Sequence, residues 1–352
     1  MMLNFLAKGL SLCLLISITF TFPVLQSEGQ YQEHSGTSEI IFFGKEETKW
    51  VEKREVPLPV ILVQGAKEEP RVDSFDLRED SIGPTKKLSA STTQPGCAYS
   101  SRFTSGVARA LMGDKALYEK GRYRYLKGAY EDAIASFQKL IQEYPRSEWA
   151  GSSYYWMGEA RYHQEKDDGA FSYFHGVVEK YPGSEFSAYA LYSCGWIRLK
   201  HAVFEEGHQF FHQAYEKNPA HPVAESSLFW SGYALYQVGR YAEALQEMET
   251  LLQKYPAGKW RPEAEYLIGA SAFRLKRFKE AADQFKNFWR RYPKHPLEES
   301  SHYALAWSQV SLGQYSEGRK TFENLLLTYP GTKLSDAIFW GIVKTHLGAD
   351  EV

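Results

Sequence analysis

The chain has 352 residues, of which 43% are hydrophobic and 15% aromatic, with a formal net charge of −2. Such a composition is typical of a folded protein and not of a disordered one. The balance of 41 basic and 43 acidic side chains leaves no strong positive charge for nucleic acid, so we predict no nucleic-acid partner.

Residues 1–29 have the pattern of a targeting segment. Lys8 is the only charged residue before Glu28, and the apolar run Leu10–Phe22 lies between them. A basic start followed by an apolar run predicts a cleaved signal peptide. The alternative is an uncleaved N-terminal anchor, because the uncharged stretch Gly9–Ser27 approaches the length that spans a membrane. Either reading predicts that the remainder is exported.

The three cysteines are not expected to carry chemistry. Cys13 lies within the apolar run, with the large residue Leu12 before it and further apolar residues after it. Cleavage before Cys13 would divide the signal, so we expect no lipid there. An oxidising compartment would permit a disulfide between Cys97 and Cys194, but nothing in the sequence shows that the two are close. Cys194 is expected to be a small buried residue.

Residues 30–113 are predicted to be a mostly irregular linker region. Charged clusters alternate with two short apolar runs, Ile40–Phe43 and Pro57–Val63, and no heptad pattern is present. The two runs are candidates for short strands.

Six prolines recur at an interval of 37 residues through the rest of the chain. Self-similarity at such a period is the signature of a solenoid, in which each repeat packs on its neighbours. The prolines are Pro145, Pro182, Pro219, Pro256, Pro293 and Pro330.

Three further columns keep their character when each repeat is numbered so that its proline is position 32. Positions 8 and 20 are glycine or alanine in all six repeats, and position 24 is large and apolar. Small residues let helices approach closely while the large residue fills the groove, which predicts two packed helices per repeat, A and B. Position 24 is occupied by Phe137, Phe174, Phe211, Met248, Phe285 and Phe322.

Local signals place the ends of these helices. Proline has no N–H and disfavours a helical residue before it, so each proline is expected to end helix B. Ser147 and Ser184 are predicted N-caps of the next helix A. Leu334–Gly348 is expected to be a lone helix A that caps the stack. The turn between helices A and B carries a glycine in three repeats: Gly128, Gly239 and Gly313.

Small residues at positions 8 and 20, an aromatic at 24 and proline at 32 resemble the tetratricopeptide repeat (TPR) pattern, whose usual period is about 34. The phrases Tyr144-Pro145-Arg146-Ser147 and Tyr181-Pro182-Gly183-Ser184 are similar to repeats of the periplasmic cell-division coordinator that binds TolA and of the lipoprotein in the outer-membrane β-barrel assembly machine. The resemblance covers about 114–352. It implies an all-α fold, a right-handed α-solenoid of about six TPR-like helix pairs plus a C-terminal capping helix, and a periplasmic or envelope-associated protein with a protein or peptide partner.

Candidate partner-binding residues follow from the same resemblance. In TPR proteins generally, positions 9 and 13 of helix A face the concave groove, and here these positions vary between repeats. Trp196, Tyr233 and Trp307 are the predicted anchors, because rigid aromatic side chains dominate binding hot spots. Lys200 and Arg274 are predicted to orient an acidic or C-terminal group. The alternative is that these aromatics fill gaps between repeats. Position 5 is aromatic in every repeat and is expected to be core.

A metal site is the less favoured interpretation of a histidine pair. His208 and His212 lie four residues apart on a predicted helix, with His201 and Glu205 as candidate third ligands. Gln209 stands where a zinc protease carries its glutamate, and solvated histidines are the ordinary alternative. We found no phosphate loop and no nucleophile elbow. We therefore predict that the protein is not an enzyme and binds neither a metal nor a cofactor.

A basic stretch in the fifth repeat suggests an acidic partner or peripheral association with anionic lipid headgroups, although charged solenoid faces are ordinary. The stretch comprises Arg274, Lys276, Arg277, Lys279, Lys286, Arg290, Arg291 and Lys294.

The sequence thus favours a non-catalytic adaptor with a concave groove. The alternative is a structural subunit of an outer-membrane assembly, secretion or cell-division complex.

Overall fold

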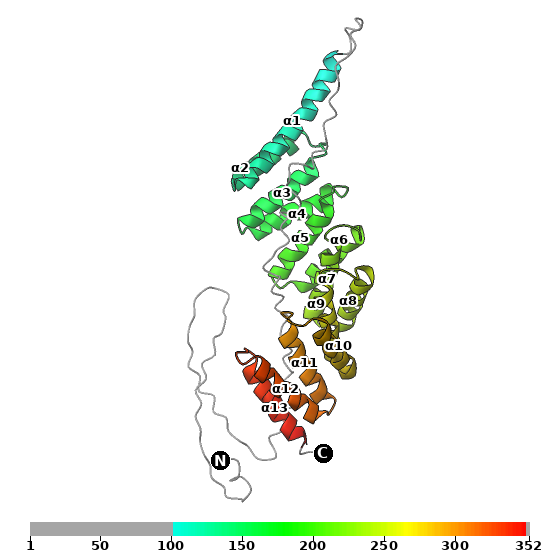
Figure 1. Ribbon diagram of the computed structural model, residues 1–352. Coiled ribbons are helices and arrows are strands. Elements are labelled where there is room, and N and C mark those ends of the chain that lie inside the picture. The colour runs from blue at the N-terminus through cyan, green and yellow to red at the C-terminus, as the bar shows by residue number, and fades with distance from the viewer. Residues whose placement is uncertain (1–100, 350–352) are drawn as a thin grey trace, which may run out of the picture. The chain divides into compact units, whose positions relative to one another are not determined.

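The computed structural model describes residues 101–349, where the regular structure consists of thirteen α-helices joined by short turns (Figure 1). The helices are α1 (Ser101–Leu126), α2 (Tyr130–Glu143), α3 (Ala150–His163), α4 (Asp167–Lys180), α5 (Ser187–Lys200), α6 (Phe204–Lys217), α7 (Ala224–Val238), α8 (Tyr241–Lys254), α9 (Arg261–Arg274), α10 (Phe278–Arg291), α11 (Glu298–Ser311), α12 (Tyr315–Thr328) and α13 (Ser335–Ala349).

Each helix packs on the next one along the chain, and helices A of adjacent repeats also touch, as α7 touches α9. The odd-numbered helices α1–α11 are helices A, and the even-numbered helices are helices B. α13 is a seventh helix A that packs on α12. The predicted α-solenoid of six helix pairs plus a capping helix is therefore confirmed. α1 begins at Ser101, ahead of Asp114, where the repeats were expected to start.

The predicted packing between positions 8 and 24 is confirmed. Each position-24 side chain is at most 1% exposed. A Cβ at Gly158 would lie 2.6 Å from the ring of Phe174, so the glycine is what allows α3 and α4 to approach. Position 5 also faces helix B of its own repeat, since Tyr155 packs on Phe174 at 5.3 Å between ring centroids. The six position-5 aromatics are at most 6% exposed, as expected for core residues: Tyr118, Tyr155, Tyr192, Phe229, Tyr266 and Tyr303.

The turn between helices A and B is left-handed in all six repeats. Three of them use glycine, as at Gly239, where φ is +91°. Glu165, Ala202 and Lys276 hold the same position in the other three, with φ near +60°. At the other end of the repeat, every helix B ends two residues before its proline, as predicted.

The serine caps are the exception, because the N-cap prediction is wrong by two residues. Trp149 and Phe186 precede α3 and α5, and neither makes a side-chain capping bond. Ser147 instead caps a short turn ahead of α3: its Oγ accepts a hydrogen bond from the Trp149 N–H at 3.1 Å and donates one to Asp114 at 2.6 Å. The residues that lengthen the repeat form this extra turn, so the helix begins later than the serine suggests.

Several sequence-based predictions fall outside the described residues: the targeting segment 1–29, the apolar runs in 30–100, Cys13 and Cys97. Cys194 is fully buried on α5, as expected, and burial raises the pKa of its thiol.

Candidate binding site

Trp196 belongs to an aromatic cluster that joins helices A of the third and fourth repeats. Its ring meets that of Trp230 on α7 edge-on at 4.5 Å, and it also contacts Tyr192 and Phe211. Trp230 is 1% exposed, whereas Trp196 is only half-buried. Part of the indole of Trp196 therefore reaches the surface from a rigid base.

Tyr233 extends the same cluster along α7. Its ring lies 5.4 Å from that of Trp230, edge-on, and the side chain is half-buried. Burial raises the pKa of the Tyr233 phenol, while a hydrogen bond with Gln237 opposes the shift. We define Trp196, Trp230 and Tyr233 as the aromatic patch. Trp230 could not be selected from the sequence because it lies at position 6. Only positions 9 and 13 were expected to face the groove.

Trp307 occupies a different environment from the other two predicted anchors. It is 1% exposed and packs on Phe322 and Tyr303, at 5.5 and 6.2 Å between centroids. The ammonium group of Lys344, on α13, lies 5.8 Å from the centre of its ring. The structure thus places Trp307 in the core, between α11 and α12 of its own repeat and beneath Lys344 of α13.

Lys200 and Arg274 both bridge the end of one helix A to the start of the preceding helix B. Lys200 Nζ lies 2.9 Å from a carboxylate oxygen of Asp167 and 5.4 Å from the centre of the Tyr162 ring. Arg274 donates two hydrogen bonds, of 2.9 and 2.7 Å, to the phenol oxygen of Tyr241. Each pair joins residues 33 apart in the sequence. Both cations therefore hold adjacent repeats together at the same place in the repeat.

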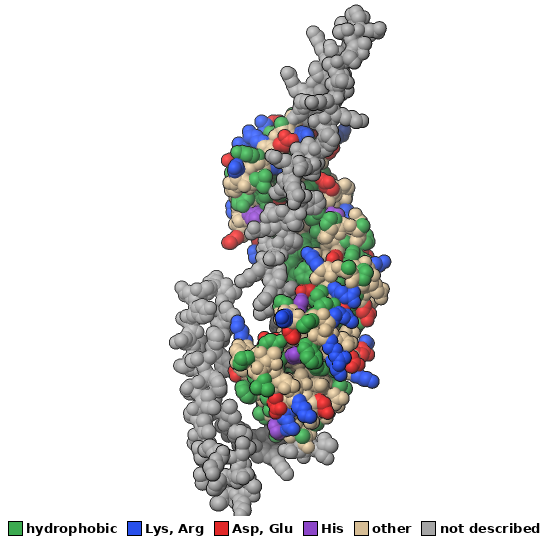
Figure 2. All heavy atoms as spheres, in the orientation of Figure 1, with side chains coloured by type: hydrophobic (Ala, Val, Ile, Leu, Met, Phe, Trp, Pro, Cys, Tyr) green, Lys and Arg blue, Asp and Glu red, His purple; other side chains and the backbone are tan. Residues whose placement is uncertain are grey.

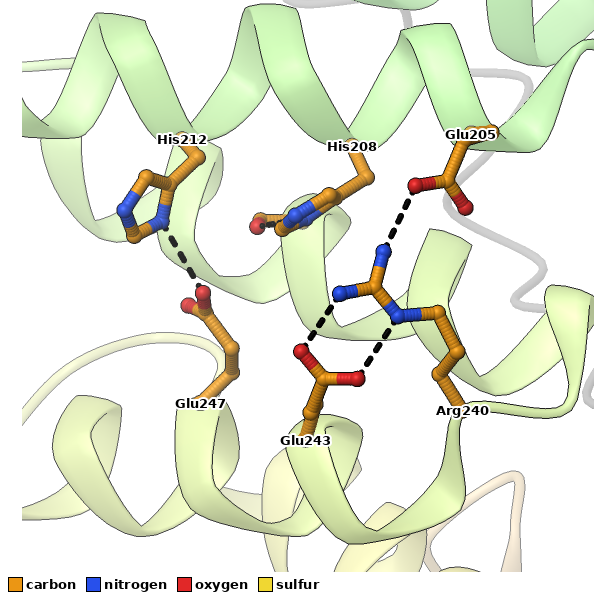
Figure 3. Close-up of polar contacts among 7 residues, drawn as sticks. Glu205, His208, His212, Arg240, Glu243 and Glu247 are labelled. Atoms are coloured by element: carbon orange, nitrogen blue, oxygen red, sulfur yellow. Dashed lines mark hydrogen bonds and ion pairs between the residues drawn. The ribbon is translucent and has the colours of Figure 1, made fainter.

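The two candidate metal-binding histidines have separate partners (Figure 3). Nδ1 of His208 lies 2.9 Å from Oγ of Ser231, and Nδ1 of His212 lies 2.9 Å from Oε1 of Glu247. Burial lowers the pKa of His208 and raises that of Glu247.

The proposed third ligands are also engaged elsewhere. Glu205 accepts a 2.6 Å hydrogen bond from Arg240, which also pairs with Glu243 (Figure 3). His201 lies 2.8 Å from Asp167. Among residues 101–349, no group of three or more His, Cys, Asp or Glu side chains is placed to hold a metal ion. The histidine pair therefore joins α6 to α7 and α8.

The basic stretch divides into paired and exposed side chains. Arg291 lies 2.6 Å from Glu265, whose side chain is 6% exposed, so this pair is structural. Arg277 approaches Glu280 at 3.8 Å. Lys286 and Arg290 on α10 are exposed and, within the described part of the chain, form no ion pair. No helix in residues 101–349 is both long and apolar enough to cross a membrane.

A protein-family model describing an outer membrane lipoprotein, YfiO, matches the chain twice in succession, over residues 111–221 and 220–339. Together these matches cover more than half of the chain. The chain belongs to the YfiO family of outer membrane lipoproteins. No curated protein matches the chain.

Several solved structures of repeat proteins are similar to the chain. The C-terminal part of a TPR protein from Cytophaga hutchinsonii is 16% identical, with a TM-score of 0.49 over 64% of this chain and 84% of that one. PilF of Pseudomonas aeruginosa is 13% identical, with a TM-score of 0.43 over 69% of this chain and 99% of that one. The TPR protein YrrB is 15% identical, with a TM-score of 0.46 over 56% of this chain and 94% of that one.

The repeat columns, the helix pairs and the family match agree. The described chain is a TPR-type α-solenoid of the YfiO family.

Proposed function

We propose that this protein is an exported, non-catalytic adaptor of the bacterial cell envelope that binds a protein or peptide at the aromatic patch. The observation that carries the proposal is that Trp196 and Tyr233, both partly exposed, pack on the buried ring of Trp230. Rigid aromatic side chains bind at low entropic cost, and a partner side chain that covers them gains apolar burial.

Lys200 gives this site its charge preference. Its side chain is 48% exposed although it pairs with Asp167, and an ammonium group carries three N–H donors. A carboxylate of the partner can accept from a donor that Asp167 leaves unused. Arg274 is held by Tyr241 at the matching place two repeats further on. The partner that fits is a segment with an apolar side chain for the aromatic patch and an acidic or C-terminal carboxylate. Trp307 is left out of the proposed contacts because it is buried.

The test is crosslinking in the cell, with a photoreactive residue in place of Tyr233 and, as control, in place of Lys139, which is exposed on α2. We expect a discrete partner to be captured at Tyr233 and not at Lys139. Trp196→Phe should keep capture, because the ring survives, while Trp196→Ala should reduce it. Unchanged capture in Trp196→Ala, in a protein of normal helicity, would contradict the site.

Export to the envelope is supported by the targeting pattern of residues 1–29 and by the outer membrane family match. We propose a processed signal peptide as the route, without a lipid on Cys13. The location would be periplasmic or envelope-associated.

A structural subunit of an envelope assembly is the second candidate, favoured by the exposed cations on α10. Trp289 is 40% exposed beside Lys286 and Arg290, which makes a mixed apolar and basic surface on helix B. A Lys286→Glu, Arg290→Glu double variant should release the protein from its native complex on gels or in sedimentation. Arg291 is unsuitable for this test because it pairs with the buried carboxylate of Glu265, so its loss would disturb the core. An intact complex in the double variant would exclude this surface.

A further inference from the structure

The capping helix α13 presents an apolar surface at a place where the other helices A are covered. Among the described residues, the six position-5 aromatics are at most 6% exposed, and in five of the six pairs the ring packs on the position-24 ring of helix B in the same repeat. Trp340 holds position 5 in α13 and is 38% exposed. Figure 2 shows hydrophobic side chains at the surface over this end of the solenoid. The exposed apolar residues of α13 are Phe339, Trp340, Val343 and Leu347.

These residues form one stripe that also carries two opposite charges. Asp336, Trp340, Val343, Lys344 and Leu347 follow one another at spacings of four, three, one and three, so they share one side of the helix. The opposite side is buried against α12, with Ile338 at 0% and Thr345 at 1% exposure. We define Asp336, Phe339, Trp340, Val343, Lys344 and Leu347 as the α13 stripe. Asp336 lies near its N-terminal end, and Lys344 lies beyond Trp340.

A helix cannot pack on this stripe as closely as helix B packs on helix A in the full repeats. In the six full repeats position 8 is glycine or alanine, and even a methyl group at Gly158 would lie 2.6 Å from Phe174. Position 8 of α13 is Val343, which is 48% exposed. Its branched side chain keeps a partner helix at the ordinary interaxial distance of about 8–10 Å.

We propose that the α13 stripe binds the α13 stripe of a second copy of this chain, antiparallel and about a two-fold axis beside Trp340. Asp336 and Lys344 stand four residues on either side of Trp340, about 6 Å along the helix in each direction. Antiparallel pairing therefore places Asp336 beside Lys344 of the second copy, and the reverse contact follows from symmetry. The two tryptophans meet at the centre, and Val343 packs on Ala337 of the other copy. The proposed adaptor site at Trp196 and Tyr233 takes no part.

The first test is sedimentation velocity of the processed chain over a wide concentration range. We expect a monomer–dimer equilibrium in the wild type. Trp340→Glu should weaken the dimer by roughly thirtyfold or more, as expected for a central aromatic anchor. Tyr123→Glu, at another exposed aromatic residue on α1, should leave the dimer unchanged. Circular dichroism of each variant checks that the helices remain folded.

The second test uses the symmetry of the proposed contact. Asp336→Lys and Lys344→Asp should each weaken the dimer, because each places two like-charged pairs opposite one another. An equimolar mixture of the two variants should restore a dimer, since both contacts then join opposite charges. A wild type that is monomeric at every concentration, a Trp340→Glu variant that dimerises normally, or a mixture that fails to associate overturns the proposal. The first of these outcomes would exclude a second copy as the occupant of the stripe.

Discussion

The ring of Phe174 on α4 fills the space that a side chain at Gly158 on α3 would need, since a Cβ there would lie 2.6 Å from two ring carbons. Gly121 with Phe137 and Gly195 with Phe211 repeat this relationship one repeat before and one after, at 2.5 and 2.7 Å. The small and large columns of the sequence are thus the two sides of one contact. Their spacing sets how closely helices A and B pack.

Gly158→Ala should lower the free energy of unfolding by about 1–3 kcal/mol, measured by chemical denaturation, because the core around Phe174 is already filled. Alanine is a better helix former than glycine by up to about 1 kcal/mol, so a net loss isolates the steric effect. Gly183→Ala is the control. No atom lies within 4 Å of its Cβ position, and we expect a change within about 0.5 kcal/mol. Equal stability of the Gly158→Ala variant and the wild type would contradict the packing argument.

Features that recur in every repeat could be predicted from the sequence, and features that belong to one repeat could not. The prolines, the small positions and the core aromatics repeat because one packing geometry repeats. Trp196 and Trp307 share position 9, yet only Trp307 is buried, where it packs on Phe322 of α12 and lies beneath Lys344 of α13. That difference depends on the neighbouring helices, so the residue type at position 9 does not reveal it.

The two candidate cations, Lys200 and Arg274, also show that a single variable position does not reveal its contacts. Lys200 pairs with Asp167 and Arg274 pairs with Tyr241, so the partner at the start of helix B changes along with the residue at position 13. A variable position resembles a ligand-binding position as long as its partner in the preceding repeat is not considered. The sequence signal that would have found these pairs is the constant separation of 33 residues between two variable positions.

Asp167→Asn should weaken the junction between the second and third repeats. Asp167 is 11% exposed and faces both Lys200 and His201, at 2.9 and 2.8 Å. A double-mutant cycle with Lys200→Met should give a coupling of about 0.5–1 kcal/mol in thermal unfolding, because Lys200 itself is half exposed. The matched control is the exposed pair Lys139–Glu143, for which we expect a coupling below about 0.5 kcal/mol. Coupling no larger than in this control would show that the contact does not join the repeats.

The exported protein should lack residues 1–29 and carry no lipid. Cleavage after the small residues near Ser27 removes Cys13 with the signal, so the mature mass should equal that of the unmodified remaining chain. Intact-mass measurement of protein from the envelope fraction checks this, and Cys13→Ser should be processed identically. A lipid-modified cysteine at the new N-terminus would contradict the prediction.

Acidification should destabilise the protein through His208, among other partly buried histidines. Burial, followed by the charges of His212 and Arg240, lowers the pKa of His208 from its usual 6.5. The folded state then binds the proton more weakly than the unfolded state. Its contribution to stability is complete above pH 6.5 and is lost as the pH falls through the folded-state pKa. Burial also lowers the pKa of His221 and His302, so part of the decline belongs to them.

His208→Gln should therefore make the decline shallower without abolishing it. The amide can still hydrogen-bond to Ser231, which separates loss of the titrating group from loss of the contact. The free energy of unfolding measured by urea denaturation between about pH 8 and pH 5 gives the slope directly. His346→Gln, at an exposed histidine on α13, controls for removal of a histidine. Parallel curves for His208→Gln and the wild type would mean that proton binding at His208 is the same in the folded and unfolded chains.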